Sequence, residues 1–153
     1  MAYDFQTGGA NVAYKIYENR LNIVNFQTLR IAGGFEPLDS ARVKRALAAS
    51  LIRLTAEDGG ETIGMLRVAG DGAFVFVIAD LLVHPTRRGE GIGTALVSRA
   101  LDLISMMVPQ GSWGTVTLVA ASGREEFYRN LGFHTIPYGE VGHGMQAYVR
   151  GHR

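Results

Sequence analysis

The feature that most constrains this sequence is a turn with three glycines, placed between an apolar segment and an amphipathic one. The apolar segment ends at Val83, and the turn carries Gly89, Gly91 and Gly93. From about Ile92 onward, apolar residues recur at the three- and four-residue spacing of a helix with one buried face. A glycine-rich turn at a helix start leaves backbone N–H groups free beside the positive end of the helix dipole. The pattern therefore predicts a strand, a turn that can hold a phosphate, and a helix.

Two familiar phosphate-binding patterns do not fit this turn. The Walker pattern requires a lysine after its last glycine, and here Gly93 is followed by Thr94. The dinucleotide-binding pattern requires a third glycine at position 94 or 96, and these positions hold Thr94 and Leu96. The turn therefore belongs to neither class.

The spacing Arg88-x-x-Gly91-x-Gly93 resembles the pyrophosphate-binding loop of the GNAT superfamily, the acetyl-CoA-dependent N-acetyltransferases. A second match follows, because the segment 126–133 is similar to the Phe-Tyr-x-x-x-Gly-Phe segment of the same family. One short glycine motif is a weak signal, but two motifs in order and at family spacing are specific. The resemblance covers roughly residues 51–150.

The resemblance implies that the chain binds acetyl-CoA as a co-substrate and uses no metal. Backbone N–H groups of the glycine turn would surround the pyrophosphate, and Arg87 or Arg88 would add a charge-assisted contact. The pantetheine arm would pair with the strand edge at Leu81 and Val83, and the N–H of Leu81 would polarise the thioester carbonyl. The residues so assigned to cofactor binding are Leu81, Leu82, Val83, Arg88, Gly89, Glu90, Gly91, Ile92, Gly93, Thr94 and Ser122.

The resemblance also assigns catalytic roles. Tyr128 would be the general acid that protonates the departing thiolate. The general base is open, since Val77 stands where several family members carry a glutamate. Asp80 is the best local candidate, because it interrupts an apolar strand, where a carboxylate needs a partner or a function. The alternatives are a structural carboxylate bonded to turn backbone and a base that acts through a bound water.

The sequence departs from the family pattern near the second motif. Ala121 stands where many relatives carry an asparagine that bonds pantetheine, so that contact is either lost or supplied by another residue, for which Ser122 is the candidate. The segment 137–145 resembles the ending of a subset that includes plastid arylalkylamine acetyltransferases. The residues that this likeness would place near the acceptor are Tyr138, Glu140 and Met145.

Composition excludes several other classes of function. The chain has 153 residues, a net charge of +1 and no run of Lys or Arg longer than two, so we expect no nucleic-acid or membrane partner. It has no cysteine, which excludes a disulfide framework, a thiolate metal site and a cysteine nucleophile. Its four histidines lack metal-ligand spacing. We expect a cytoplasmic location, and the resemblance allows a homodimer through the C-terminal strands.

The element pattern favours an α+β fold with a mixed, mostly antiparallel central sheet flanked by helices. By the resemblance, strands four and five of this sheet splay apart to admit the cofactor. We expect a flexible N-terminus over residues 1–10 and a single N-acetyltransferase domain over residues 11–153. A capping box at Ser122 and Glu125 predicts a short helix. The expected strands cover 13–17, 51–56, 62–68, 74–83, 115–120, 133–137 and 146–149, and the other helices cover 22–32, about 39–49 and 92–107.

The resemblance implies an enzyme that transfers acetyl from acetyl-CoA directly to a primary amine in a ternary complex. The expected acceptor is a small arylalkylamine- or polyamine-like molecule. The alternatives are a protein lysine or N-terminal acetyltransferase, and a non-catalytic acyl-CoA-binding regulatory module. A nucleotide-binding domain is a third class, and it would be stabilised by ATP or NAD rather than by acetyl-CoA.

Overall fold

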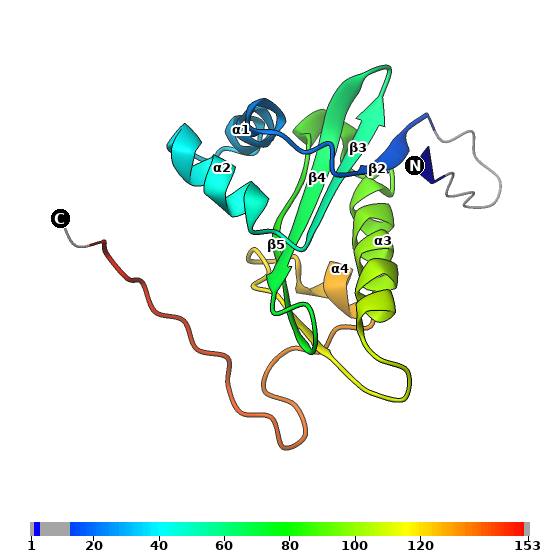
Figure 1. Cartoon of the computed structure of the whole chain (residues 1–153), viewed down its shortest axis with the longest axis vertical. Helices are drawn as coiled ribbons and strands as arrows, with labels where there is room; N and C mark the ends of the chain where they lie inside the picture. The colour runs from blue at the N-terminus through cyan, green and yellow to red at the C-terminus, as the bar shows by residue number, and fades with distance from the viewer. Residues whose placement is uncertain (1, 4–12, 152–153) are drawn as a thin grey trace. The chain divides into compact units, whose positions relative to one another are not determined.

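A computed structural model describes residues 2–3 and 13–151, which fall into two compact units, Met1–Leu118 and Val119–Arg153. The first unit holds a six-stranded sheet with the strands in chain order (Figure 1). Its strands are β1 (Ala2–Tyr3), β2 (Lys15–Glu18), β3 (Ile52–Asp58), β4 (Glu61–Gly70), β5 (Val75–Val83) and β6 (Thr115–Thr117). Its helices are α1 (Ile23–Ala32), α2 (Ser40–Ala48), the short 3₁₀ helix η1 (Pro85–Arg87) and α3 (Ile92–Met107).

The pairing of the strands confirms the expected α+β class. Strands β1 to β5 pair antiparallel with their neighbours, and β5 and β6 form the one parallel pair among the described strands. Most of the flexible start that we expected at residues 1–10 lies outside the described residues. Of that segment, Ala2 and Tyr3 pair with Tyr17 and Ile16 of β2.

The helices of the first unit cover opposite faces of the sheet. A Cβ added to Gly64 of β4 would lie 2.9 Å from Ile92 and 3.2 Å from Leu96, so this face meets the first turns of α3. The next residue, Met65, belongs to an apolar cluster with residues of α1 and α2 such as Phe26 and Val43. Because consecutive strand residues point to opposite faces, α3 lies on one side of the sheet and α1 and α2 on the other (Figure 1).

Strands β5 and β6 separate after a short shared segment. Their pairs are Val75 with Thr115, Phe76 with Val116, and Val77 with Thr117. In the described part of the chain, no strand pairs with β5 from Ile78 to Val83 on this side. The expected divergence of two strands is therefore present, and it leaves β5 with an open edge from Ile78 to Val83.

In the second unit, two expectations were wrong. Helix α4 (Glu125–Arg129) has Arg124 as its N-cap and no side-chain cap bond, so Ser122 and Glu125 do not form a capping box. Gly123, with φ of 81°, turns the chain before the helix and separates Ser122 from it.

The two late strands also failed to form in the described residues, where only an isolated bridge joins Tyr138 to Val141. Alternating apolar residues predict a strand only if a partner strand buries them. Met145, Tyr148 and Val149 are instead more than nine-tenths exposed. None of the described helices is long and apolar enough to cross a membrane.

The turn between β4 and β5 makes the fold sensitive to one glycine. Gly70 has φ of 152°, and a Cβ there would lie 2.1 Å from the carbonyl oxygen of Val75. We expect Gly70→Ala to lower the free energy of unfolding by about 3 kcal/mol, because a backbone atom must move. Gly72→Ala is the matched control. Gly72 has φ of 74°, and a Cβ there would lie 3.6 Å from the side chain of Leu51, so we expect the free energy of unfolding to fall by only about 1 kcal/mol. Urea unfolding of both variants measures the difference, and equal losses would contradict the clash.

Candidate functional site

The glycine turn leaves the first turn of α3 uncapped. Gly91 is its N-cap with φ of 80°, no side-chain cap bond is formed by the described residues, and its first turn holds no acidic residue. The other long helices of this unit differ: Asn22 caps α1 and Asp39 caps α2, each by accepting a backbone N–H at 2.9 Å. Within the part of the chain that the structure describes, the start of α3 therefore has no capping side-chain oxygen of the kind that usually accepts from these amides.

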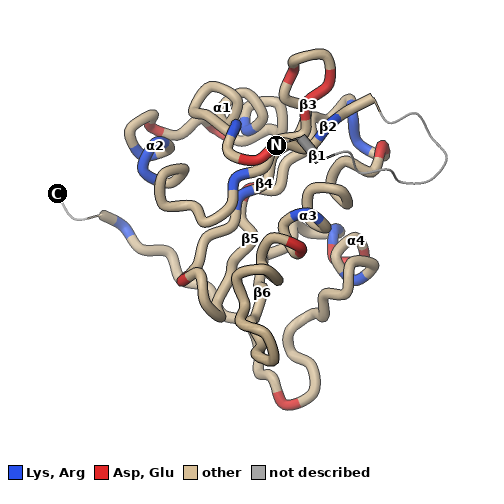
Figure 2. Tube along the Cα trace, turned by 45° about the vertical axis from the view of Figure 1, so that its right-hand side comes forward, with Lys and Arg blue, Asp and Glu red and all other residues tan. Residues whose placement is uncertain are grey.

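The two arginines of the turn have different surroundings. Arg87 donates to Glu90 at 2.8 Å and to Asp58 at 2.9 Å, and these bonds raise its pKa. Arg88 is exposed, and within the described residues it has no carboxylate partner. Elsewhere, charges of both signs are spread along the trace (Figure 2). Of the two arginines that could meet a phosphate, Arg88 is the one whose guanidinium is not already engaged.

We expect Arg88→Met to raise the KM for acetyl-CoA about tenfold and to leave the melting temperature unchanged. The paired variant Arg87→Met should lower the melting temperature instead, because it leaves Asp58 and Glu90 without their cation. Steady-state kinetics and thermal unfolding of both variants measure the contrast. The assignment fails if Arg87→Met raises the KM for acetyl-CoA and Arg88→Met does not.

Sequence reasoning did not find a third side chain at this turn. The hydroxyl of Tyr14 lies 3.9 Å from the position that a Cβ on Gly91 would take. Partial burial raises the pKa of Tyr14, and the charge of Glu90 raises it further, so its phenol stays protonated and able to donate near neutral pH. Tyr14 is far from the turn in the sequence and belongs to no motif, so no signal in the sequence alone points to it.

The open edge of β5 presents the backbone that the sequence analysis singled out. The N–H of His84 donates to Ile63 of β4 at 2.8 Å. Since backbone groups of alternate residues point to opposite sides of a strand, the N–H groups of Leu81 and Val83 point away from β4. They face the side that β6 has left, as the expectation for the pantetheine arm requires. The side chain of Leu82 packs instead against the apolar cluster under α1 and α2.

Asp80 lies at the same edge, beside two arginines. Its Oδ2 accepts from Nε of Arg67 at 2.5 Å, and its Oδ1 lies 3.8 Å from Nη1 of Arg30. Its side chain is 20% exposed, and both arginines are similarly covered. The alternative of a carboxylate bonded to turn backbone does not describe this site, because the partners are side chains of β4 and α1.

The second unit holds the proposed acid, Tyr128, on α4. Its ring makes edge contacts with Phe127 and Phe133, at centroid distances of 4.9 Å and 5.8 Å. Burial raises the pKa of Tyr128 above its ordinary value. Ser122 is exposed before this helix. The three residues that the late-segment likeness assigned to the acceptor, Tyr138, Glu140 and Met145, are exposed, and Tyr138 stacks on His134 at 4.9 Å.

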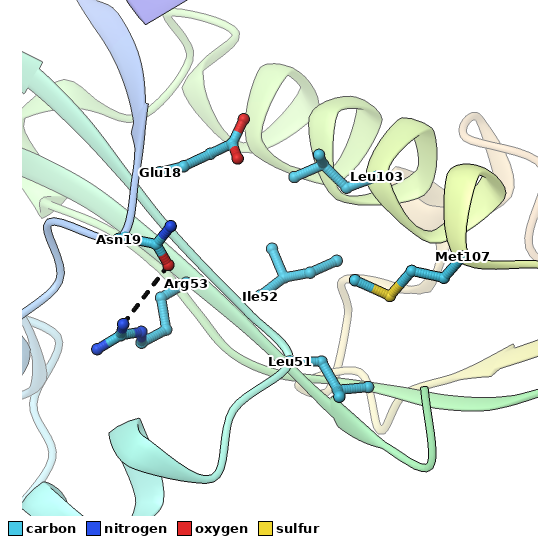
Figure 3. A pocket seen from close by; sticks show the side chains of 7 residues that line it. All are labelled: Glu18, Asn19, Leu51, Ile52, Arg53, Leu103 and Met107. Atoms are coloured by element: carbon cyan, nitrogen blue, oxygen red, sulfur yellow. Dashed lines mark hydrogen bonds between the residues drawn. The ribbon is translucent and has the colours of Figure 1, made fainter. Parts of the chain in front are cut away.

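A hollow elsewhere in the first unit is not this site. It has a volume of about 80 Å³ and lies between β3 and the last turns of α3 (Figure 3). A ligand pocket usually measures about 300–1,000 Å³, so the hollow suits a few waters at most. In the described residues no group of three or more His, Asp or Glu side chains could hold a metal ion. The residues lining the hollow are Glu18, Asn19, Leu51, Ile52, Arg53, Leu103 and Met107.

Known proteins resemble this chain in sequence. The chain is 40% identical over 102 residues to histone acetyltransferase TAP1 of Glycine max, covering 63% of this chain and 42% of that one. It is 32% identical over 108 residues to serotonin N-acetyltransferase 2, chloroplastic, of Oryza sativa subsp. japonica, covering 68% and 52%. The chain thus spans about two fifths to one half of the length of these relatives.

Solved structures agree with the fold described above. A GNAT family acetyltransferase from Streptococcus pneumoniae superimposes with a TM-score of 0.74 at 25% identity, covering 90% of this chain and 99% of that one. A GNAT family acetyltransferase from Brucella melitensis, solved in complex with acetyl-CoA, has a TM-score of 0.62 at 22% identity and covers 90% and 97%. The family described as acetyltransferase (GNAT) domain matches residues 51–135, which is more than half of the chain. The chain therefore belongs to the GNAT family of acetyltransferases.

Proposed function

We propose that the chain is an acetyl-CoA-dependent N-acetyltransferase that transfers the acetyl group directly to a primary amine. The observation that carries this proposal is the start of α3, where no side chain caps the amides and Arg88 lies unpaired among the described residues. These groups suit a pyrophosphate, because an anion at a helix N-terminus accepts from backbone N–H groups and meets the positive end of the dipole. The amides at the start of α3 and the guanidinium of Arg88 therefore fit the pyrophosphate of coenzyme A.

Acetyl-CoA would supply the activated acetyl group, and residues of this chain would hold it and move the protons. The N–H of Leu81 would stabilise the developing oxyanion, and the N–H of Val83 would hold the pantetheine arm. As the amine nitrogen bonds to the carbonyl carbon and the C–S bond breaks, the phenol of Tyr128 would give its proton to the sulfur. The nitrogen would release one proton, directly or through a bound water, to the phenolate so formed, which restores the phenol. No cysteine is present to form a thioester with the enzyme, which favours direct transfer.

For the acceptor, we propose a small arylalkylamine- or polyamine-like amine. One relative is named a serotonin N-acetyltransferase, and Phe35 and Trp113 offer aromatic surfaces that are 50% and 69% exposed. Asp80 is neutralised by its arginines, so it is a poor counter-charge for a cationic amine. Glu140 is exposed and has no cation within the described residues, which makes it the better candidate for that contact.

The test is a thiol-release assay with a panel of amines. Because the chain has no cysteine, a thiol reagent reports only the coenzyme A set free by transfer. The panel should contain tryptamine, spermidine, glucosamine 6-phosphate and a lysine-containing peptide. We expect the largest kcat/KM for tryptamine or spermidine.

Three other results would each favour a specific alternative. The largest kcat/KM for the peptide would favour a protein acetyltransferase, for which the name of the soybean relative is the supporting observation. Binding of acetyl-CoA without thiol release from any amine would favour a regulatory module. Thermal stabilisation by ATP or NAD but not by acetyl-CoA would favour a nucleotide-binding domain.

A further inference from the structure

Asp80 occupies a backbone conformation that costs energy. Its φ is 52°, in the left-handed region that non-glycine residues rarely adopt. The pairing shows why. Ala79 lies opposite Arg67 and Leu82 opposite Met65, so two residues of β5 face one residue of β4. This is a β-bulge with Asp80 inside it, and such strain persists only where neighbouring groups over-determine the conformation.

The bulge reverses the direction of the backbone groups along β5. Before the bulge, the carbonyl of Phe74 accepts from the N–H of Thr115 at 2.8 Å, so the backbone N–H and C=O groups of even-numbered residues point toward β6. After the bulge, the N–H of His84 donates to the carbonyl of Ile63, so the backbone groups of even-numbered residues point toward β4. Without the extra residue, Leu82 rather than Leu81 and Val83 would present its N–H at the open edge.

Two cations hold Asp80 in this place from different elements. Arg67 comes from β4, directly across the bulge, and Arg30 comes from α1. Arg30 is itself fixed: it donates to the carbonyl of Glu36 at 3.1 Å, and its guanidinium lies 5.3 Å from the ring centre of Phe35. The carboxylate therefore ties the bulge to the neighbouring strand and to the helix that covers this face.

We propose that Asp80, clamped by Arg67 and Arg30, is a positioning residue that determines which backbone amides of β5 meet the pantetheine arm. This inference rests on the proposed function and replaces the role of base that the sequence favoured for Asp80. A base must be able to take a proton from the substrate ammonium. Each oxygen of the Asp80 carboxylate already faces a guanidinium, Oδ2 that of Arg67 and Oδ1 that of Arg30, so the protein itself engages both oxygens.

The test compares two ligands that differ in the pantetheine arm. Coenzyme A carries the arm, and adenosine 3′,5′-bisphosphate does not. We expect Asp80→Asn to raise the Kd for coenzyme A about tenfold and to leave the Kd for the bisphosphate within about twofold. Asparagine and glycine both tolerate a positive φ, so Asp80→Gly serves as a second variant in which the bulge stays accessible but the clamp is lost. Titration calorimetry gives the binding-competent fraction as well as the Kd, so partial unfolding is recognised.

A matched control removes the same charge elsewhere. Glu57 is 14% exposed and pairs with Arg20 at 3.2 Å on a different part of the sheet, so Glu57→Gln should leave both ligands unaffected. The pH profile of kcat/KM for the amine distinguishes a positioning residue from a base. If Asp80 were the base, the fall of kcat/KM at low pH would disappear in Asp80→Asn, whereas we expect that fall to remain. If both ligands weaken equally, if neither weakens, or if the fall at low pH disappears, the positioning role is wrong. If the unmodified protein binds neither ligand, the proposed function itself fails.

Discussion

Tyr128→Phe is expected to lower kcat by about 100-fold to 1,000-fold, while the Kd for acetyl-CoA stays within about twofold. The change removes one hydroxyl and keeps the ring, so the edge contacts with Phe127 and Phe133 remain. In the proposed mechanism, what is lost is the proton that the departing thiolate would take up. A loss confined to kcat identifies a group that acts in the transition state, whereas a rise in the Kd would identify a binding contact. Single-turnover kinetics and calorimetry separate the two.

The pH dependence provides a second check on Tyr128. Burial raises its pKa above the ordinary 10.0, so the phenol keeps its proton through the neutral range. An acid is lost as the pH rises through its pKa, so Tyr128 should cause no fall in kcat below about pH 10. Tyr148→Phe is the control, because that ring is 91% exposed and outside both motifs. Retention of kcat within about threefold in Tyr128→Phe would rule out its role as the acid.

Much of the fold could be predicted from the sequence where the determinants are local. The structure has α3 at Ile92–Met107, as the apolar period and the preceding glycine predicted. Asp39 was one of two proposed caps for α2, and its carboxylate accepts from Arg42. In each case, the residues that determine the structure lie within one turn of the feature that they set.

The features that the sequence did not reveal depend on residues far apart in the chain. Asp80 was recognised as a carboxylate that needs a partner, but its partners lie on α1 and on the neighbouring strand. Their meeting depends on the sheet register and on which face α1 covers. The bulge has no glycine to mark it, because an aspartate takes the positive φ. Tyr14 likewise reaches Gly91 only through the folded sheet. Long-range pairing of this kind leaves no periodic signal in a single sequence.

Gly91→Val is expected to weaken acetyl-CoA binding by at least about 100-fold. Gly91 has φ of 80° and precedes the free amides of α3. A branched side chain there opposes the left-handed conformation and stands close to the hydroxyl of Tyr14, where phosphate oxygens would approach. The proposal assigns both pyrophosphate contacts and the dipole of α3 to this point, so several charge-assisted hydrogen bonds are lost together, each worth about 1.5–3 kcal/mol.

Backbone strain alone would also lower the stability of Gly91→Val, and a second glycine separates the two effects. Gly111 has φ of 78°, and a Cβ there would have no neighbour within 4 Å, so Gly111→Val imposes nearly the same strain beyond the other end of α3. Both variants should lose about 1–3 kcal/mol of stability, but only Gly91→Val should lose the cofactor. Calorimetric titration of acetyl-CoA into the two folded variants gives the difference in affinity directly. Equal affinities would mean that the amides at the start of α3 do not hold the pyrophosphate, and the site would have to be sought elsewhere.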